Sequence, residues 1–338
     1  LLTGALGGIG SQLAVELVRD YEAHLVLTGR SPLPEVDDCP AWLAKHPSDD
    51  PRYARVQRLA TIAAAGPGRV TYLAGDIADP EHVERLRTTI AQTHGRLDGI
   101  LHAAGELETR QLALRTKPPA SLARVLSAKV AGSLQLAGLL EDWPAAQLVL
   151  FSSIGSLSGA LSAGESDYAA GCRVQNHLAA RLRATGHAAT AVALSEWGTS
   201  GMLAANTVGP IVRQLGLRPM TPDTASAAFA QAVASGAAAP LLLAGTAKFD
   251  HRRMLSGQME STAATAETLD YPQLVTTVRQ ASTDGASRLA ELIPQFEGLD
   301  AALDRLATTY VTQLLSTVEL PADHDELTAA LQLQPRYT

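Results

Sequence analysis

Short apolar runs alternate with helix-period segments along most of this chain, and that alternation limits its possible folds more than any other feature. The apolar runs have the length of strands and lie at Ala23–Thr28, Val70–Ala74, Gly99–Ala103, Gln147–Ser152, Ala188–Leu194 and Pro240–Ala244. Strands that alternate with helices need right-handed crossovers, which make the strands parallel and place helices on both faces of the sheet. The pattern therefore predicts an α/β protein with a Rossmann-type, doubly wound parallel sheet.

The composition of the chain changes after residue 255. Residues 256–270 are small and polar, which is typical of a linker. Within residues 271–338, Leu299, Leu303, Leu306 and Tyr310 recur at helical spacing and predict an amphipathic helix. We expect one α/β domain over residues 1–255 with a truncated first strand, cut from a longer polypeptide. A linker and a C-terminal helical extension that leads into a following domain would come after it.

Charge and cysteine content exclude several classes of function. The chain has 27 Lys and Arg against 34 Asp and Glu, and its basic residues are scattered singly, so it lacks the basic patch expected for a nucleic-acid or anionic-lipid partner. Cys39 and Cys172 lie far apart without histidines at ligand spacing, which fits a reducing cytoplasm and argues against a metal site. No apolar run has membrane-spanning length, so we expect a cytoplasmic location and no membrane partner.

A glycine-rich turn joins the end of the first strand to a helix. Thr-Gly-Ala-Leu-Gly-Gly-Ile-Gly begins at Thr3, and helix-period residues follow over Ser11–Asp20. Glycines allow the backbone to approach a pyrophosphate closely, and a helix N-terminus favours its negative charge. The turn therefore predicts a dinucleotide site that includes Thr3, Gly4, Leu6, Gly8, Ile9 and Gly10.

The second strand ends in Gly29, Arg30 and Ser31. A Rossmann site that prefers NAD usually has an acidic residue here, to bind the ribose hydroxyls. The planar guanidinium of Arg30 instead suits a 2′-phosphate, and Ser31 can add a hydroxyl donor. The strand end predicts NADPH as the cofactor, although Arg30 taken alone also fits a solvated loop.

Two further strand ends extend the predicted cofactor site. Asp76 and Ile77 follow the third apolar run, where Asp76 could accept a hydrogen bond from an adenine or cap the next helix. His102 ends the fourth run and is interpreted as structural. Three small residues follow it and would let a nicotinamide ribose lie against the backbone: Ala103, Ala104 and Gly105.

Candidates for the chemistry of ketone reduction lie in the second half of the domain. Such a reaction needs a donor to the developing alkoxide and an acid that delivers a proton. Ser153 follows a buried strand, and Tyr168 comes after a loop rich in glycine and serine. Because a tyrosine ordinarily titrates near pH 10, it needs a nearby cation, and Lys129 is the candidate. Each residue alone could be structural, but the ordered set predicts Lys129, Ser153 and Tyr168 as catalytic, with Lys129 and Tyr168 also binding the cofactor.

The order of these residues resembles one family. Simple short-chain dehydrogenases have Tyr-x-x-x-Lys, whereas this chain has Tyr-Ala-Ala-Gly-Cys from Tyr168 to Cys172 and its lysine upstream. The upstream Lys129, the Phe-Ser-Ser strand end, Tyr-Ala-Ala-Gly and the segment Glu196–Met202 resemble the ketoreductase domains of modular polyketide synthases. The likeness covers about residues 1–255.

This resemblance implies a cytoplasmic domain of a multifunctional enzyme of antibiotic biosynthesis. Its substrate would be a β-ketoacyl chain on the phosphopantetheine of an acyl carrier protein, and its partners would be that carrier and neighbouring synthase domains. Trp197, Gly198 and Met202 would lie on the substrate side. Cys172 departs from the family, in which most members have Asn there. Because a thiol is a poor hydrogen-bonding partner, we expect weakened activity.

Three alternatives stay open. Similar reductases in nonribosomal depsipeptide synthetases reduce an α-ketoacyl group. Some ketoreductase-like domains only scaffold their neighbours, although the presence of Lys129, Ser153 and Tyr168 counts against that role here. A free-standing metabolic reductase is disfavoured by the upstream lysine and the Trp-Gly segment.

Overall fold

The computed structural model describes residues 1–107, 117–157, 162, 164–198, 213, 216–242 and 244–245. All of them belong to the first of two compact units, Leu1–Arg279. The second unit, Gln280–Thr338, lies outside the described residues, as do the predicted linker and helical extension.

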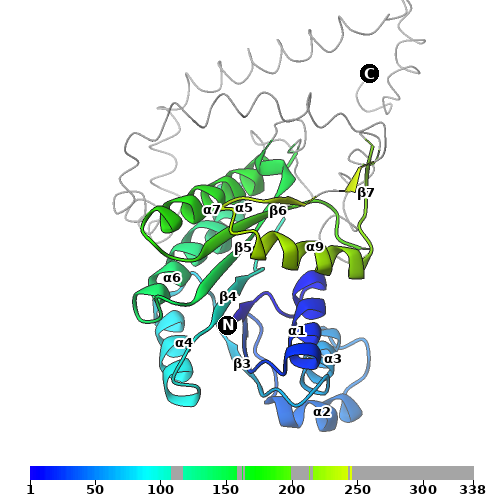
Figure 1. The fold of residues 1–338 in the computed structure, drawn as a ribbon. Coiled ribbons are helices and arrows are strands. Elements are labelled where there is room, and N and C mark those ends of the chain that lie inside the picture. The colour runs from blue at the N-terminus through cyan, green and yellow to red at the C-terminus, as the bar shows by residue number, and fades with distance from the viewer. Residues whose placement is uncertain are drawn as a thin grey trace, which may run out of the picture. The chain divides into compact units, whose positions relative to one another are not determined.

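A seven-stranded parallel sheet forms the centre of the described structure (Figure 1). Its order is β3-β2-β1-β4-β5-β6-β8, so the direction in which strands are added reverses between β1 and β4. This confirms the predicted Rossmann-type fold, and a reversal of this kind is where such sheets hold ligands. The strands are β1 (Leu2–Thr3), β2 (Leu25–Gly29), β3 (Val70–Ala74), β4 (Gly99–His102), β5 (Gln147–Ser153), β6 (Ala189–Leu194) and β8 (Leu241–Leu242). A separate antiparallel pair is formed by β7 (Leu217–Arg218) and β9 (Ala244–Gly245).

Helices connect the strands and cover both faces of the sheet. The helices are α1 (Gly8–Tyr21), α2 (Cys39–Lys45), α3 (Tyr53–Ala63), α4 (Pro80–Thr93), α5 (Pro119–Leu126), α6 (Ser133–Gly138), α7 (Ser166–Ala184) and α9 (Pro222–Ala234). The shorter helical turns are η1 (Val36–Asp38), η3 (Ser127–Gly132), η4 (Leu139–Glu141) and η5 (Ile154–Ser156). Figure 1 shows α1, α3 and α9 on one side of the sheet and α4, α6 and α7 on the other.

The alternation of side chains along β5 explains why the apolar runs are continuous. Leu148 and Leu150 pack into the core beneath α4, α6 and α7. Val149 and Phe151 point to the opposite face and pack with Phe229 of α9. Since helices cover both faces, each position of the strand gains from burial, by about 1.5–3 kcal/mol for a large apolar side chain.

The composition of residues 32–50, rich in proline and aspartate, is typical of a surface insertion, but the structure shows more order than a plain loop. Part of this segment folds into η1 and α2. Cys39 is fully buried in the same cluster as Val56 and Leu59 of α3, and Trp42 packs against that cluster. The apolar residues within this proline-rich stretch give it a core contact that its overall composition conceals.

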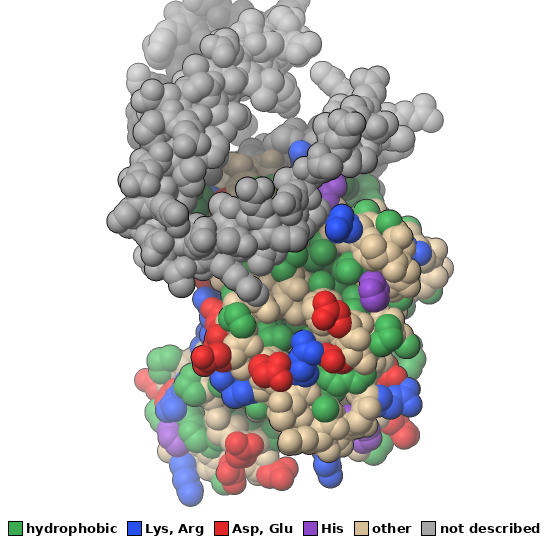
Figure 2. Space-filling view, turned by 90° about the vertical axis from the view of Figure 1, so that its left-hand side faces the viewer, with side chains coloured by type: hydrophobic (Ala, Val, Ile, Leu, Met, Phe, Trp, Pro, Cys, Tyr) green, Lys and Arg blue, Asp and Glu red, His purple; other side chains and the backbone are tan. Residues whose placement is uncertain are grey.

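None of the described helices combines the length and the apolar character needed to cross a bilayer. On the face of the molecule drawn in Figure 2, the described acidic and basic side chains are interspersed.

Candidate cofactor and catalytic site

The glycine turn after β1 is shaped by close backbone contacts. Gly4 has a φ of 70°, and a Cβ atom there would lie 2.7 Å from the carbonyl carbon of Ala103. A Cβ on Gly10 would likewise collide with the backbone of Gly4. Helix α1 begins at Gly8 with no side-chain cap and no acidic residue in its first turn. Its first N–H groups therefore have no side-chain acceptor, which suits a phosphate.

The other predicted members of this turn are held within the protein. The carbonyl of Leu6 accepts a hydrogen bond from Arg58 at 2.7 Å. Ile9 is partly buried against the core cluster of Phe151 and Phe229. The Leu6 carbonyl and the Ile9 side chain are thus both held by contacts within the protein.

Thr3 and His102 tie the ends of β1 and β4 together. The Thr3 hydroxyl lies 2.7 Å from Nδ1 of His102 and accepts from the amide of Ala104 at 3.2 Å. Nε2 of His102 lies 2.9 Å from the carbonyl oxygen of Ala128. Burial, reinforced by the charge of Lys129, lowers the pKa of His102 to about 3. The ring is thus neutral and structural, as expected. The hydroxyl of Thr3, a predicted member of the dinucleotide site, is engaged by His102 and Ala104.

The end of β2 is fixed by a residue that the sequence analysis missed. The hydroxyl of Tyr72, on β3, lies 3.0 Å from the carbonyl oxygen of Gly29 and 2.7 Å from that of Ser31, and donates to them. Burial raises the pKa of Tyr72 to about 12, so the phenol remains a donor. This bridge fixes the loop that presents Arg30, whose side chain is 62% exposed.

Glu106 connects two arginines at the edge of the sheet. One carboxylate oxygen accepts from Arg30 and the other from Arg124, each at 3.0 Å. Burial by itself would raise the pKa of Glu106, but the hydrogen bonds from Arg124 and Arg30 outweigh it and hold the pKa below its ordinary value. Glu106 directly follows Gly105, and that position after a strand end was the one sequence signal that could have identified it.

The third strand end separates two roles that the sequence left open. Asp79, not Asp76, caps α4, because its side chain accepts from the amide of Glu81. Asp76 is exposed at the sheet edge and accepts from the amide of Ala78 at 2.9 Å. Ile77 is only 4% exposed and belongs to the core. Its backbone, rather than its side chain, is what a cofactor could contact.

Lys129 is buried in a single π-helical turn, η3, between α5 and α6. Such turns are rare and often mark functional sites. Its Nζ donates to the carbonyl oxygen of Phe151 at 2.5 Å and lies 5.2 Å from the centroid of the Tyr168 ring. A Cβ on Gly105 would lie 2.9 Å from Cε of Lys129 and 3.6 Å from Cε2 of Tyr168. The structure therefore brings together Gly105, Lys129 and Tyr168, as the sequence predicted.

Tyr168 lies in the first turn of α7 and is 8% exposed. It packs against Val125 and the fully buried Cys172. Burial raises the pKa of Tyr168 well above its ordinary value, and the charge of Cys172 and its hydrogen bond to Tyr168 raise it further. The expected lowering by Lys129 is not seen, because the ammonium faces the ring and donates to Phe151 instead.

The two ionisable neighbours of Tyr168, Lys129 and Cys172, also have shifted pKa values. Burial lowers the pKa of Lys129, which Cys172 partly opposes. Burial raises the pKa of the Cys172 thiol, against the charge of Lys129 and hydrogen bonds with Tyr168 and Ser152. The thiol and the phenol are thus both protonated near neutrality, and Tyr168 is in the form that can act as an acid.

Ser153 ends β5 at the carboxyl edge of the sheet. Its Oγ accepts from the amide of Gly155 at 3.2 Å, which caps η5. This bond uses the oxygen as an acceptor, so the hydroxyl proton can still be donated to a ligand.

A buried ion pair includes Asp167, the residue that precedes Tyr168. Nζ of Lys117 and Oδ1 of Asp167 are 2.5 Å apart, and the two side chains are 1% and 2% exposed. Oδ2 of Asp167 is buried and has no hydrogen-bond partner among the described residues. The pair connects the start of α7, next to Tyr168, to the residues before α5. Sequence reasoning missed it because the partners are 50 residues apart and belong to no motif.

Comparison with known proteins decides the family. A family model described as "KR domain" matches residues 1–199. The chain belongs to this ketoreductase family. Polyketide synthase PksL of Bacillus subtilis is 36% identical over 171 residues, or 50% of the chain. Erythronolide synthase EryA3 of Saccharopolyspora erythraea is 33% identical over 236 residues, or 70% of the chain. The chain spans only 4% and 7% of the lengths of these two relatives.

Solved structures agree with this assignment. PlmKR1, the ketoreductase from the first module of phoslactomycin biosynthesis in Streptomyces sp. HK803, is 29% identical, with a TM-score of 0.60 over 73% of this chain and 53% of that one. The predicted resemblance to polyketide synthase ketoreductases is confirmed.

The KR domain buries the tryptophan that was expected on the substrate side. Trp197 is 2% exposed, donates from Nε1 to Gln12 of α1 at 3.1 Å, and contacts the ring of Phe229 at 5.8 Å between centroids. Gly198 has a φ of 62° and donates its amide to Met220 at 2.7 Å. The ring of Trp197 is therefore a core contact just after β6, and its place on the substrate side stays a prediction. Met202 lies outside the described residues.

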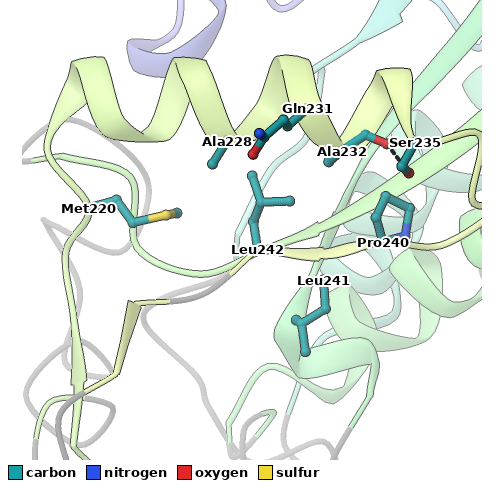
Figure 3. Close-up of a pocket in the computed structure, with 8 residues that line it drawn as sticks. All are labelled: Met220, Ala228, Gln231, Ala232, Ser235, Pro240, Leu241 and Leu242. Carbon is teal, nitrogen blue, oxygen red and sulfur yellow. Dashed lines mark hydrogen bonds between the residues drawn. The ribbon is translucent and has the colours of Figure 1, made fainter.

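A cavity of about 480 Å³ lies between α9 and the strand β8 (Figure 3). Eight residues line it: Met220, Ala228, Gln231, Ala232, Ser235, Pro240, Leu241 and Leu242. None of them has a side chain that titrates near neutrality, and none is a predicted site residue of the KR domain. The cavity therefore contains none of the predicted site residues.

Proposed function

We propose that this KR domain uses NADPH to reduce the ketone of a β-ketoacyl chain carried on the phosphopantetheine of an acyl carrier protein. The observation that carries the proposal is the packing of Lys129 and Tyr168 against Gly105 at the carboxyl edge of the sheet. The relatives are parts of large synthases, which supports neighbouring synthase domains as further partners.

The described residues fit an NADP-type dinucleotide. The uncapped N-terminus of α1 would hold the pyrophosphate, and the exposed Arg30 with Ser31 would hold the 2′-phosphate. Ala103, Ala104 and Gly105 would lie against the nicotinamide ribose. When bound, this cofactor supplies the hydride that reduces the ketone carbon.

Residues of the chain would bind the ketone oxygen and protonate it. The Ser153 hydroxyl donates a hydrogen bond to that oxygen and stabilises the charge that develops on it. The Tyr168 hydroxyl then transfers its proton to the same oxygen, which leaves a phenolate. Burial keeps Tyr168 protonated but makes the phenolate costly. The Lys129 ammonium, 5.2 Å from the ring centroid, would offset part of that cost by turning from the Phe151 carbonyl to the phenolate oxygen. The phenolate regains its proton from solvent.

The test is NADPH oxidation measured with a β-ketoacyl thioester and, separately, with an α-ketoacyl thioester. We expect turnover on the β-keto substrate. Turnover on the α-keto substrate alone would instead support a reductase of the kind found in depsipeptide synthetases. If a folded chain that binds NADPH oxidises it with neither substrate, a scaffolding role would be favoured.

An Arg30→Ala variant tests the cofactor assignment separately. We expect weaker binding of NADPH and unchanged binding of NADH, because only NADPH has a 2′-phosphate for Arg30 to hold. Equal effects on the two nucleotides would contradict the role given to Arg30.

A further inference from the structure

Glu106 forms ion pairs with Arg30 and Arg124, and these three side chains together are called the Glu106 bridge. Arg30 follows β2, Glu106 follows β4, and β1 lies between these two strands. The link from Arg30 to Glu106 therefore passes over the end of β1, where Gly4 begins the turn. Arg124 of α5 holds the second oxygen of Glu106, so the bridge is anchored on its other side.

This bridge lies at the reversal of strand order between β1 and β4, where sheets of this kind bind dinucleotides. Arg30 is the proposed ligand of the 2′-phosphate, yet one of its terminal nitrogens already donates to Glu106. An ionised carboxylate has no proton to offer to phosphate oxygens, so the two anions can only share or compete for the guanidinium. The lowered pKa of Glu106 shows that the carboxylate stays charged near neutrality.

We propose that Glu106 weakens the preference of this domain for NADPH over NADH, by competing with the 2′-phosphate of NADPH for Arg30. This inference rests on the proposed function. Glu106 lowers the affinity for NADPH and leaves the affinity for NADH unaffected, because NADH has no phosphate at that position. The domain thereby discriminates less between the two nucleotides than Arg30 alone would allow.

The experiment measures the dissociation constants of NADPH and NADH by fluorescence titration at low, constant ionic strength, where screening is weakest. Glu106→Gln keeps the size of the side chain and removes its charge. The matched control is Glu84→Gln, which removes a charge that is 66% exposed and paired with Arg87 on α4. For charges several ångströms apart near a surface, we expect Glu106→Gln to bind NADPH roughly three- to tenfold more tightly. NADH binding should stay within about twofold, and Glu84→Gln should change neither constant.

A double-mutant cycle identifies the partner. In an Arg30→Ala background, the gain from Glu106→Gln should disappear, because the two changes act on one interaction. Unchanged or weaker NADPH binding in Glu106→Gln would overturn the proposal, and so would an equal gain for NADH. Failure of the parent chain to bind either nucleotide would overturn the proposed function itself, which is a distinct result.

Discussion

The buried pair of Lys117 and Asp167 gives a sharp prediction about stability. Asp167→Asn preserves the shape of the side chain but leaves the Lys117 ammonium buried without a counter-charge. Both side chains are almost fully buried, so water cannot replace the lost partner. Removal of one member of such a pair costs about 3–5 kcal/mol of unfolding free energy. The unpartnered Oδ2 of Asp167 means that few other hydrogen bonds compensate this carboxylate.

The assay is thermal unfolding followed by circular dichroism. For a domain of this size, about 1 kcal/mol corresponds to 2–4 °C, so Asp167→Asn should lower the Tm by roughly 6–20 °C. The matched control is Asp20→Asn, which breaks the exposed pair with Arg19, whose side chains are 55% and 46% exposed. It should leave the Tm unchanged within error.

A double replacement separates the buried charge from the shape of the site. Lys117→Met with Asp167→Asn leaves no charge at the site of this pair, so it should recover most of the Tm lost in Asp167→Asn. A parent-like Tm for Asp167→Asn, or a double variant no more stable than the single one, would refute this stabilising role of the ion pair.

Three further changes test other parts of the site. Cys172→Ala should lower the pKa of Tyr168, because Cys172 raises it. The basic limb of the pH profile of kcat/KM should therefore move to lower pH. An unchanged basic limb would contradict this prediction. The depressed pKa of His102 keeps its ring neutral in the folded chain while the unfolded chain takes up a proton below about pH 6.5. Stability should therefore fall by about 2 kcal/mol between pH 7 and 5, as urea unfolding measures, and less steeply in His102→Gln. Gly4→Ala should lower the free energy of unfolding by at least about 2 kcal/mol in the same urea assay. The φ of Gly4 is 70°, and the backbone of Ala103 leaves no room for a Cβ atom. A variant as stable as the parent would refute this prediction.

The sequence predicted the fold well because burial on both faces leaves a plain local signal. All six apolar runs became strands of the sheet, with ends shifted by only a few residues. The glycine turn after β1 and the small residues after β4 also lie where they were expected. These features depend on a few neighbouring residues, which pattern reasoning can detect.

The contacts that complete the site join residues far apart in the chain and have no local signature. Tyr72 fixes the loop of Arg30 from a neighbouring strand, and Glu106 reaches Arg30 across the end of β1. Asp79 rather than Asp76 caps α4, a difference of three residues that composition cannot resolve. Trp197 belongs to a motif, but only the packing shows that its ring is in the core.

We propose that a hydride from NADPH reaches the β-keto carbon and that Tyr168 delivers a proton to the oxygen. The most direct measurement uses NADPH deuterated at the hydride-donating carbon, a β-ketoacyl thioester, and mass spectrometry of the product, with the parent chain beside Tyr168→Phe. We expect the parent chain to form a β-hydroxyacyl product that carries one deuterium from the labelled NADPH. With NADPH at a saturating concentration, the variant should form that product about 10²–10⁴-fold more slowly. A product without deuterium, or equal rates for the two proteins, would contradict the account.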